Sequence, residues 1–147
     1  MKVKQLSLFL ENKPGALSHP MQLLSKAKIN ILTLSVADAQ HFGILRLIVR
    51  DWEKAKKLLE KHNCVVKVTD VIAIEVSDRP GGLADILAVL EKAGINLEYM
   101  YAFTLKRESK GMLVFRFDAP DKAIDILRKK GVNVVGGDEL FKRLESD

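Results

Sequence analysis

Two stretches of the chain share one pattern: residues 6–17 read LSLFLENKPGAL, and residues 72–83 read IAIEVSDRPGGL. Each begins with aliphatic residues at every second position, which is typical of a strand with one buried face. A polar turn that contains Pro-Gly follows, and after the turn apolar residues recur at helical spacing. The pattern predicts a strand that turns directly into a helix, in two copies 66 positions apart.

The repetition continues along the chain. Residues 29–31 (Ile-Asn-Ile) correspond to residues 95–97 (Ile-Asn-Leu) at the same shift. Residues 43–45 (Gly-Ile-Leu) correspond to residues 111–113 (Gly-Met-Leu) at a shift of 68, after a two-residue insertion. Two copies of one structural unit explain this agreement.

Both repeats are predicted to have the element order βαββαβ. Repeat one, residues 1–69, has expected strands at 3–10, 31–37, 44–50 and 64–69 and expected helices at 16–28 and 52–62. Repeat two, residues 70–147, has expected strands at 71–77, 97–105, 112–118 and 132–135, expected helices at 82–93 and 120–130, and a short C-terminal helix at 138–144. This order is typical of the ferredoxin-like α+β fold, in which two helices cover one face of a four-stranded antiparallel sheet.

The alternation also predicts which strand residues lie beneath the helices. These are Leu6, Leu8, Leu10, Leu45, Leu47 and Val49 in repeat one, and Ile72, Ile74, Val76, Leu113, Phe115 and Phe117 in repeat two. The other sheet face is expected to carry Phe9, Ile44, Ile48, Tyr99, Tyr101 and Phe103. Because such a face is too apolar to remain hydrated, we expect it to pack against the other repeat, a second chain or a ligand.

The composition is that of a globular protein. The chain has 147 residues, of which 48% are hydrophobic and 29% charged, and a chain of this length buries a sufficient core without disulfides or metals. Its single cysteine, Cys64, favours a reducing compartment. The N-terminal residues lack the apolar core of a signal peptide, and no apolar run approaches the roughly 18 residues of a membrane span. We expect a cytoplasmic protein with no membrane partner.

The net charge of +5 raises the question of nucleic-acid binding. The lysines of residues 54–61 are interspersed with Glu53 and Glu60, as on the solvated face of an amphipathic helix. RNA-recognition domains of this fold stack bases on aromatic residues of the central strands. The outward positions of the third strands are expected to hold Arg46, Ile48, Val114 and Arg116. No nucleic-acid partner is therefore expected.

Catalytic and metal-binding patterns are missing from the sequence. His19, His41 and His62 do not have the spacing of zinc ligands. Cys64 has no neighbouring cysteine or motif-placed histidine that would favour a nucleophile. The chain contains neither a phosphate-binding loop with its lysine nor a G-x-S-x-G motif. We expect no catalytic residue, no metal site and no cofactor, and hence a protein that is not an enzyme.

The strand–helix turns are the candidate binding sites. Proline fixes φ near −65°, and glycine allows the backbone to turn sharply and approach a ligand closely. The helix that follows presents unpaired amides, which favour a carboxylate. Asn30 and Asn96 are expected to return close to the turns and to bind an ammonium or carboxylate group. The alternative is that Pro-Gly only makes the turn and the asparagine only fills a left-handed loop position.

The repeats resemble ACT domains, which are small-molecule regulatory modules. The pattern is complete in repeat two, with Asp-Arg-Pro-Gly-Gly-Leu at 78–83 and Gly-Ile-Asn at 94–96. Repeat one departs from it, with Asn12-Lys13 before Pro-Gly and Lys28 where the glycine stands in repeat two. The resemblance covers residues 3–135 and is to a stand-alone tandem ACT-domain protein.

The resemblance implies allosteric regulation by an amino acid bound where two ACT units pair edge to edge. The implied ligand-binding residues are Asn12, Lys13, Pro14, Gly15, Ala16, Leu17, Asn30 and Ile31 in repeat one, and Asp78, Arg79, Pro80, Gly81, Gly82, Leu83, Asn96 and Leu97 in repeat two. Backbone amides near the glycines would hold the carboxylate. A homodimer and a metabolic-enzyme partner are expected.

Two alternatives remain open at this point. In one, the protein is a non-catalytic subunit that docks a metabolic enzyme through its apolar sheet face and binds no small molecule. In the other, repeat one has lost binding and serves as a scaffold. Pro20 is a further difference between repeat one and repeat two. A proline inside the expected helix would remove a hydrogen bond or restart the helix beside His19.

Overall fold

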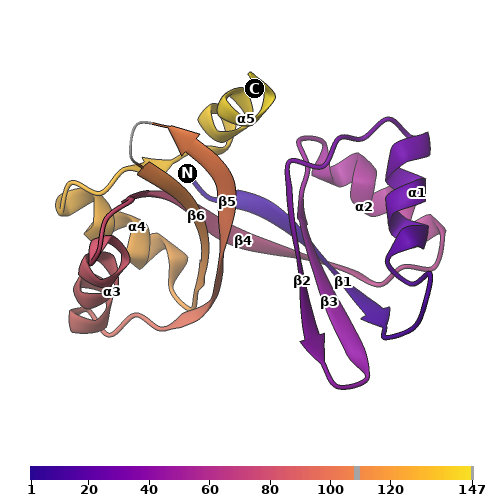
Figure 1. Ribbon diagram of the computed structural model, residues 1–147, viewed down its shortest axis with the longest axis horizontal. Coiled ribbons are helices and arrows are strands. Elements are labelled where there is room, and N and C mark those ends of the chain that lie inside the picture. Colours follow the sequence, from indigo (N-terminus) through magenta and orange to yellow (C-terminus); the bar gives the residue numbers. More distant parts are fainter. Residues whose placement is uncertain (108–109, 147) are drawn as a thin grey trace. The chain divides into compact units, whose positions relative to one another are not determined.

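The computed structural model describes residues 1–107 and 110–146 (Figure 1). The chain divides into two compact units. The N-terminal unit comprises Lys4–Thr69, and the C-terminal unit comprises Asp70–Asp147 together with Met1–Val3.

The N-terminal unit places two helices on one face of its strands (Figure 1). Its elements are β1 (Val3–Glu11), α1 (Ser18–Lys26), β2 (Thr33–Ala39), β3 (Phe42–Ile48), α2 (Trp52–Lys61) and the first part of β4 (Val66–Ser77). β3 pairs antiparallel with both β1 and β2. The β2–β3 hairpin has a tight turn at Gln40 and His41, between the strands that the sequence predicts at 31–37 and 44–50.

The C-terminal unit has the same arrangement, with α3 and α4 on one face of its sheet (Figure 1). Its further elements are α3 (Gly82–Lys92), β5 (Leu97–Arg107), β6 (Lys110–Phe117), α4 (Pro120–Lys129), β7 (Val134–Val135) and α5 (Gly137–Glu145). The strand order is β7-β4-β6-β5, and all three pairings are antiparallel. The connection between the strands that the sequence predicts at 97–105 and 112–118 includes residues 108–109, which lie outside the described residues. The α+β class and the ferredoxin-like repeats are confirmed.

One strand differs from the sequence prediction. The strands expected at 64–69 and 71–77 form a single strand, β4, that continues through Thr69 and Asp70. The reason is local, because the intervening residues include no glycine or proline that would end a strand.

The cores lie between the sheets and their helices, as the alternation predicts. In the N-terminal unit the strand residues Leu6, Leu8, Leu45 and Leu47, and Val49 directly after β3, pack with Leu24, Ala55 and Leu59 of the helices. In the C-terminal unit Ile72, Ile74, Val76, Phe115 and Phe117 pack with Ile86, Leu90, Ala123, Ile124 and Leu127. Leu10 and Leu113 join these cores as partly buried members. All twelve predicted inward residues therefore contribute to a core.

The opposite faces of the two sheets differ in exposure. Ile48 is fully buried, whereas Phe9 keeps 54% of its surface exposed and Phe42 keeps 56%. Ile44, Tyr99, Tyr101 and Phe103 are half-buried. That the other repeat, a second chain or a ligand packs against this face stays a prediction.

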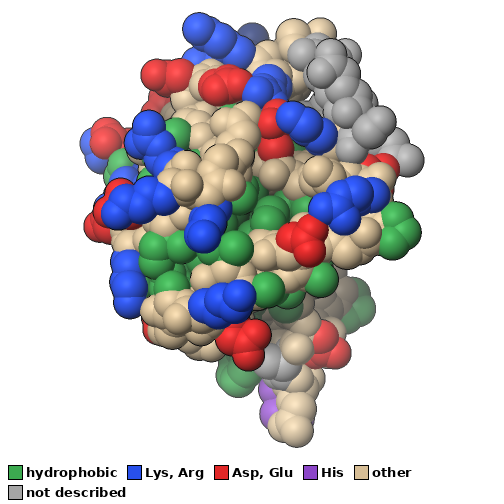
Figure 2. Space-filling model, turned by 90° about the vertical axis from the view of Figure 1, so that its left-hand side faces the viewer, with side chains coloured by type: hydrophobic (Ala, Val, Ile, Leu, Met, Phe, Trp, Pro, Cys, Tyr) green, Lys and Arg blue, Asp and Glu red, His purple; other side chains and the backbone are tan. Residues whose placement is uncertain are grey.

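Charged side chains are mixed rather than segregated by sign. On the face that carries α3 and α4, Lys and Arg alternate with Asp and Glu around apolar side chains (Figure 2). In α2, Lys56 forms an ion pair with Glu60 one helical turn later. Of the helices that the structure describes, none is long and apolar enough to cross a membrane.

Candidate functional site

Residues 12–17 form turn one, which joins β1 to α1. The Asn12 N–H donates to the His41 carbonyl (3.2 Å), and the Ala16 N–H donates to the Lys13 carbonyl (3.3 Å). Gly15 has φ +85°, a left-handed conformation that glycine adopts without strain. Backbone hydrogen bonds therefore hold turn one in this conformation, and the conformation determines where its side chains project.

Pro20 does not interrupt α1. The helix begins at Ser18 rather than at residue 16, so Pro20 lies in the first helical turn, where N–H groups have no intrahelical partner. The His19 N–H donates to the Gly15 carbonyl and the Met21 N–H to the Leu17 carbonyl, so the buried proline leaves out only the one bond between them and α1 runs on without a break. His19 beside it is exposed. The expectation of a broken or restarted helix is wrong, because residues 16 and 17 belong to the turn.

Beside turn one lies a cavity of about 270 Å³, here called the turn-one cavity. Its lining combines apolar with charged and polar residues: Leu10, Glu11, Asn12, Lys13, Ala16, Leu17, Val36, Ala37, Asp38 and Gly43. The Lys13 ammonium lies 2.8 Å from the Glu11 carboxylate, and both residues line the cavity. The hydrogen bond from Lys13 lowers the pKa of Glu11, and the same contact raises the pKa of Lys13. Both charges are thus present at neutral pH.

Residues 78–81 form turn two, which joins β4 to α3. Gly81 has φ +85° and caps α3. Gly82 has no room for a side chain, because a Cβ there would lie 2.1 Å from the Ser77 carbonyl oxygen. The Arg79 guanidinium lies 2.5 Å from Asp85 on the first turn of α3 and donates to the Pro80 carbonyl (3.1 Å). The Gly-Gly of turn two is therefore needed to bring the helix onto the strand.

A second cavity, of about 230 Å³, lies between turn two, β4 and the loop that follows α4, and is here called the Glu75 cavity. Its lining is mostly charged, polar or small: Glu75, Ser77, Arg79, Gly82, Asp85, Ile86, Lys110, Gly131, Val132 and Asn133. The turn-one cavity differs in having more aliphatic residues in its lining, among them Leu10, Leu17 and Val36.

Glu75 connects four elements of the C-terminal unit. Its carboxylate accepts from the Asn133 amide (2.7 Å) and from Arg143 of α5, and the Lys110 ammonium lies 3.7 Å away. Burial alone would raise the pKa of Glu75, but the hydrogen bonds from Asn133 and Arg143 and the nearby positive charges outweigh it and lower the pKa. The carboxylate is thus held ionised, with 13% of its side chain exposed.

The expectation that each asparagine returns to its own turn is wrong. Asn96 precedes Leu97, which pairs with Phe117, whereas turn two follows Ser77, which pairs with Lys110. Lys110 and Phe117 are the two ends of β6, seven positions and about 23 Å apart at the rise of a strand. Asn96 and turn two therefore lie at opposite ends of the unit, because α3 runs along the sheet between them.

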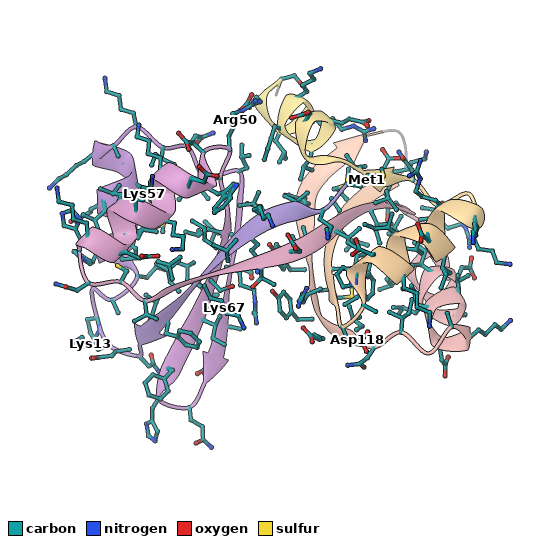
Figure 3. The ribbon with its side chains drawn as sticks, turned by 180° about the vertical axis from the view of Figure 1, so that it is seen from behind. Met1, Lys13, Arg50, Lys57, Lys67 and Asp118 are labelled. Carbon is teal, nitrogen blue, oxygen red and sulfur yellow. The ribbon has the colours of Figure 1, made fainter. Side chains whose placement is uncertain are left out.

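Asn96 has a structural role at its own end. Its N–H donates to the Asp118 carboxylate (3.1 Å), and the Asp118 N–H donates to its carbonyl (3.2 Å), so the two residues tie the start of β5 to the end of β6. Figure 3 labels Asp118 at this end of the C-terminal unit and labels Lys13 at turn one of the N-terminal unit.

The other predicted site residues divide into surface and core positions. In the N-terminal unit Asn30 also lies far from turn one, since Thr33 pairs with Ile48 whereas Glu11 pairs with Phe42. Asn12, Lys13, Pro14, Gly15, Leu17, Asn30, Asp78, Arg79, Pro80, Gly81 and Asn96 are exposed. Ile31, Leu83 and Leu97 pack against the cores. The structure thus brings together the residues of each turn and leaves the asparagines apart from them.

Sequence reasoning missed Glu75 and its partners. The strand pattern places Glu75 on the outward face of β4, which suggests contact with solvent. Asn133 and Arg143 are 58 and 68 positions from Glu75 in the sequence, and no local sequence pattern predicts contacts over such separations. The one usable sign was a carboxylate that stands between two aliphatic residues, Ile74 and Val76, near the end of β4.

Comparison with known proteins gives the same architecture. A family model described as "ACT domain pair" matches residues 1–144. The crystal structure of protein BT0572 from Bacteroides thetaiotaomicron is 40% identical over 97% of both chains, with a TM-score of 0.88. The regulatory subunit of aspartate kinase from Thermus thermophilus, in its ligand-free form, has a TM-score of 0.61 at 14% identity, covering 86% of this chain and 91% of that chain. That likeness concerns the fold alone.

One curated protein provides a sequence match over part of its length. The acetolactate synthase small subunit of Buchnera aphidicola subsp. Baizongia pistaciae (strain Bp) is 34% identical over 77 residues. The match covers 48% of this chain and 48% of that protein, so it spans about half the length of the curated relative.

Proposed function

The chain belongs to the ACT domain pair family, and on this premise we propose that it is a non-catalytic regulatory protein that binds an amino acid at its strand–helix turns. Repeat one is taken as residues 1–69 and repeat two as residues 70–147. The regulated process takes place in the cytoplasm. The curated relative is named as the small subunit of an enzyme, which supports a role beside a metabolic enzyme.

The observation that carries the proposal is the turn-one cavity. A free amino acid presents an ammonium group, a carboxylate and a side chain. The Lys13 ammonium and the backbone of turn one suit the carboxylate, and the carboxylates of Glu11 and Asp38 suit the ammonium. Leu10, Leu17 and Val36 of the lining suit an apolar ligand side chain, since such pockets are mainly apolar with a few placed polar groups.

The position of Asn30 determines whether it can contact a ligand bound at turn one. Because it lies at the far end of its own unit, it contacts a ligand at a turn only when that turn belongs to a different ACT unit. We therefore propose that two units meet edge to edge, with the turn of one facing the Asn-containing loop of the other. A homodimer provides such a meeting, and its twofold symmetry makes two equivalent sites.

Regulation would then be a coupling between ligand and assembly. A ligand held by two units at once stabilises the paired arrangement, and the paired arrangement raises the affinity for the ligand by the same factor. An enzyme that binds one arrangement better than the other would respond to the amino acid.

The test is a thermal-shift panel of the common amino acids at millimolar concentration. A ligand present at about a hundred times its dissociation constant adds about 2.7 kcal/mol to the free energy of unfolding. For a chain of this size the midpoint should rise by about 5–10 °C. A panel in which no amino acid moves the midpoint of well-folded protein would refute the proposal.

A second candidate function rests on Phe9 and Phe42. These side chains lie on the sheet face opposite α1 and α2, since Phe9 pairs with Ile44 and Phe42 is two positions from Ile44 on β3. Both keep more than half of their surface exposed. In this alternative the face docks a metabolic enzyme and no small molecule is needed. A flat thermal-shift panel together with enzyme capture that is lost in Phe42→Ser would favour it.

A further inference from the structure

Two exposed phenylalanines of the N-terminal unit are neighbours on one face of its sheet. Phe9 of β1 pairs with Ile44 of β3, and Phe42 is two positions before Ile44 on β3. Such diagonal positions on adjacent strands lie within reach of aromatic side chains. Phe9 keeps 54% of its surface exposed and Phe42 keeps 56%. Single exposed apolar residues are ordinary, but contiguous ones mark an interaction surface.

The corresponding positions of repeat two are polar. The shifts of 66 and 68 positions that relate the repeats match Phe9 with Glu75, Phe42 with Lys110, and Val65 with Asn133. The backbone supports the match near Val65, because Asn63 and Gly131, each two positions earlier, both have a left-handed φ, of 64° and 74°.

In repeat two these three positions are in contact. The Asn133 amide lies 2.7 Å from the Glu75 carboxylate, and the Lys110 ammonium lies 3.7 Å from it. Because the repeats share one fold and β1 is the neighbour of β4 in the sheet, Val65 is placed beside Phe9. Val65 keeps 66% of its surface exposed. Phe9, Phe42 and Val65 therefore form one apolar patch, here called the Phe9 patch.

In the C-terminal unit, α5 covers the corresponding face. Arg143 of α5 binds Glu75, and Leu140 of α5 is fully buried. The chain passes from β7 into α5 at residues 136–137. The corresponding residues of repeat one, 68–69, lie inside β4, so the chain continues as a strand and provides no such helix there. The Phe9 patch is thus the counterpart of a surface that carries a helix, with apolar side chains in place of the polar ones.

The size of the Phe9 patch suits a helix better than a second copy of the chain. An aromatic side chain buries about 200 Å² when it is fully covered, so the exposed parts of the three side chains amount to roughly 300 Å². A stable interface between two proteins buries about 800 Å² on each partner. An amphipathic helix, by contrast, is held by a few apolar side chains at positions i, i+3 or i+4, and i+7.

The N-terminal unit also carries the net positive charge of the chain. Residues 4–69 include eleven Lys and Arg against five Asp and Glu, a net charge of +6, whereas the rest of the chain has a net charge of −1. Arg46 and Lys67 lie on the same sheet face as the patch, since their neighbours along the strands belong to the core; Figure 3 labels Lys67. The Glu11 carboxylate is matched by the Lys13 ammonium at 2.8 Å. Acidic side chains on a partner complement these charges.

We propose that the Phe9 patch is the docking site for an amphipathic helix of a partner protein, with an apolar stripe on one side and acidic side chains along its edges. This helix takes the place that α5 has in repeat two, with an apolar side chain where α5 has Arg143. The proposal rests on the docking alternative described above and names the kind of partner for it. It requires no amino acid at turn one.

The experiment is a titration of the full chain with a fluorescently labelled designed peptide, followed by anisotropy. The peptide has about 18 residues, long enough for a helix, with leucine at i, i+3, i+4 and i+7 and glutamate at most other positions. Binding should be saturable and should fall by about tenfold or more in Phe42→Ser, the loss of a central anchor. Val65→Ser should also weaken binding.

Leu34→Ser is the matched control in the same unit. Leu34 keeps 47% of its surface exposed, but it pairs with the core residue Leu47 and so belongs to the sheet face that carries the helices. This variant should bind the peptide as the parent does. A peptide of the same composition without the leucine stripe should not bind, and one with lysine in place of glutamate should bind about tenfold more weakly.

Other occupants of the patch give different results. The parent and Phe42→Ser should have the same mass in sedimentation; a parent dimer that dissociates in Phe42→Ser would make the patch a contact between copies and overturn the proposal. Phe42→Ser should keep the thermal midpoint within a few degrees, since changes at exposed positions alter stability little. A larger fall would show that the rest of the chain covers Phe42, which also overturns the proposal.

The remaining outcomes separate this proposal from those above. A peptide that does not bind, or that binds the parent and Phe42→Ser equally, overturns the helix site. Amino-acid shifts of the thermal midpoint should be the same in the parent and in Phe42→Ser, so their absence from both refutes binding at turn one alone. Enzyme capture that is lost in Phe42→Ser although the peptide does not bind keeps the docking alternative and overturns the helix as the partner.

Discussion

The Glu75 carboxylate on β4 accepts a hydrogen bond from Arg143 on α5, across 68 positions of sequence. Because Ile74 and Val76 face α3 and α4, Glu75 points to the other face of the sheet, and α5 therefore lies on that face. Leu140 of α5 is fully buried. The C-terminal helix, which has no counterpart in the first repeat, is thus an integral part of the C-terminal unit.

The Glu75–Arg143 contact predicts a dependence of stability on acid pH. The pKa of Glu75 is lower in the folded chain than its ordinary value of 4.5, so its contribution is complete above about pH 4.5 and is lost as the pH falls through the folded value. Denaturant unfolding across this range should show the parent more stable than Glu75→Gln by roughly 1–3 kcal/mol at neutral pH. The difference should shrink in acid. A difference that is the same at pH 7 and pH 3 would contradict the assignment.

The complete burial of Leu140 predicts that this side chain holds α5 against the rest of the chain. Leu140→Ala removes a fully buried side chain and should cost about 2–4 kcal/mol in free energy of unfolding. Leu144→Ala, on the same helix but only half-buried, is the comparison and should cost less. If hydrogen exchange in α5 is unchanged in Leu140→Ala, the helix is held by something other than this contact.

We predict that position 82 tolerates no side chain larger than that of glycine. In Gly82→Ala the new Cβ would meet the Ser77 backbone, so α3 or β4 must shift, at a cost of about 2–3 kcal/mol. Gly136→Ala is the control, because a Cβ there meets no atom within 4 Å and the backbone is extended. Thermal unfolding of both variants tests the difference, and equal midpoints would refute it.

The separation of Asn30 from turn one predicts complementation between chains. Lys13→Ala and Asn30→Ala each alter an exposed residue and should leave the fold intact while weakening amino-acid binding. If a site is built from the turn of one copy and the asparagine of another, mixing the two variants should restore one intact site per mixed dimer. Titration of the co-refolded mixture measures this. Failure to recover any binding would exclude a site shared in this way.

The sequence predicts the fold well because the informative patterns are local. The alternation from Leu6 to Leu10 is repeated from Ile72 to Val76, and each fixes both a strand and its buried face. The exceptions also have local causes. The start of α1 moved from residue 16 to Ser18, and β4 proved continuous because no residue near Asp70 interrupts it.

The candidate site was predictable only in part. Turns one and two are short, continuous stretches, so their residues necessarily lie together. The place of Asn96 depends on how far α3 runs along the sheet, and Glu75 acquires its partners from a loop and a helix much later in the chain. Such relationships depend on tertiary packing rather than on any periodicity.

The continuity of β4 has a consequence for the history of the gene. A duplicated module joined by a loop can later lose one copy, since a deletion at the loop leaves the other copy whole. Here any break near Thr69 cuts through a hydrogen-bonded strand, so neither half is released intact. A deletion that removes either repeat would therefore also remove part of the strand that the other repeat continues.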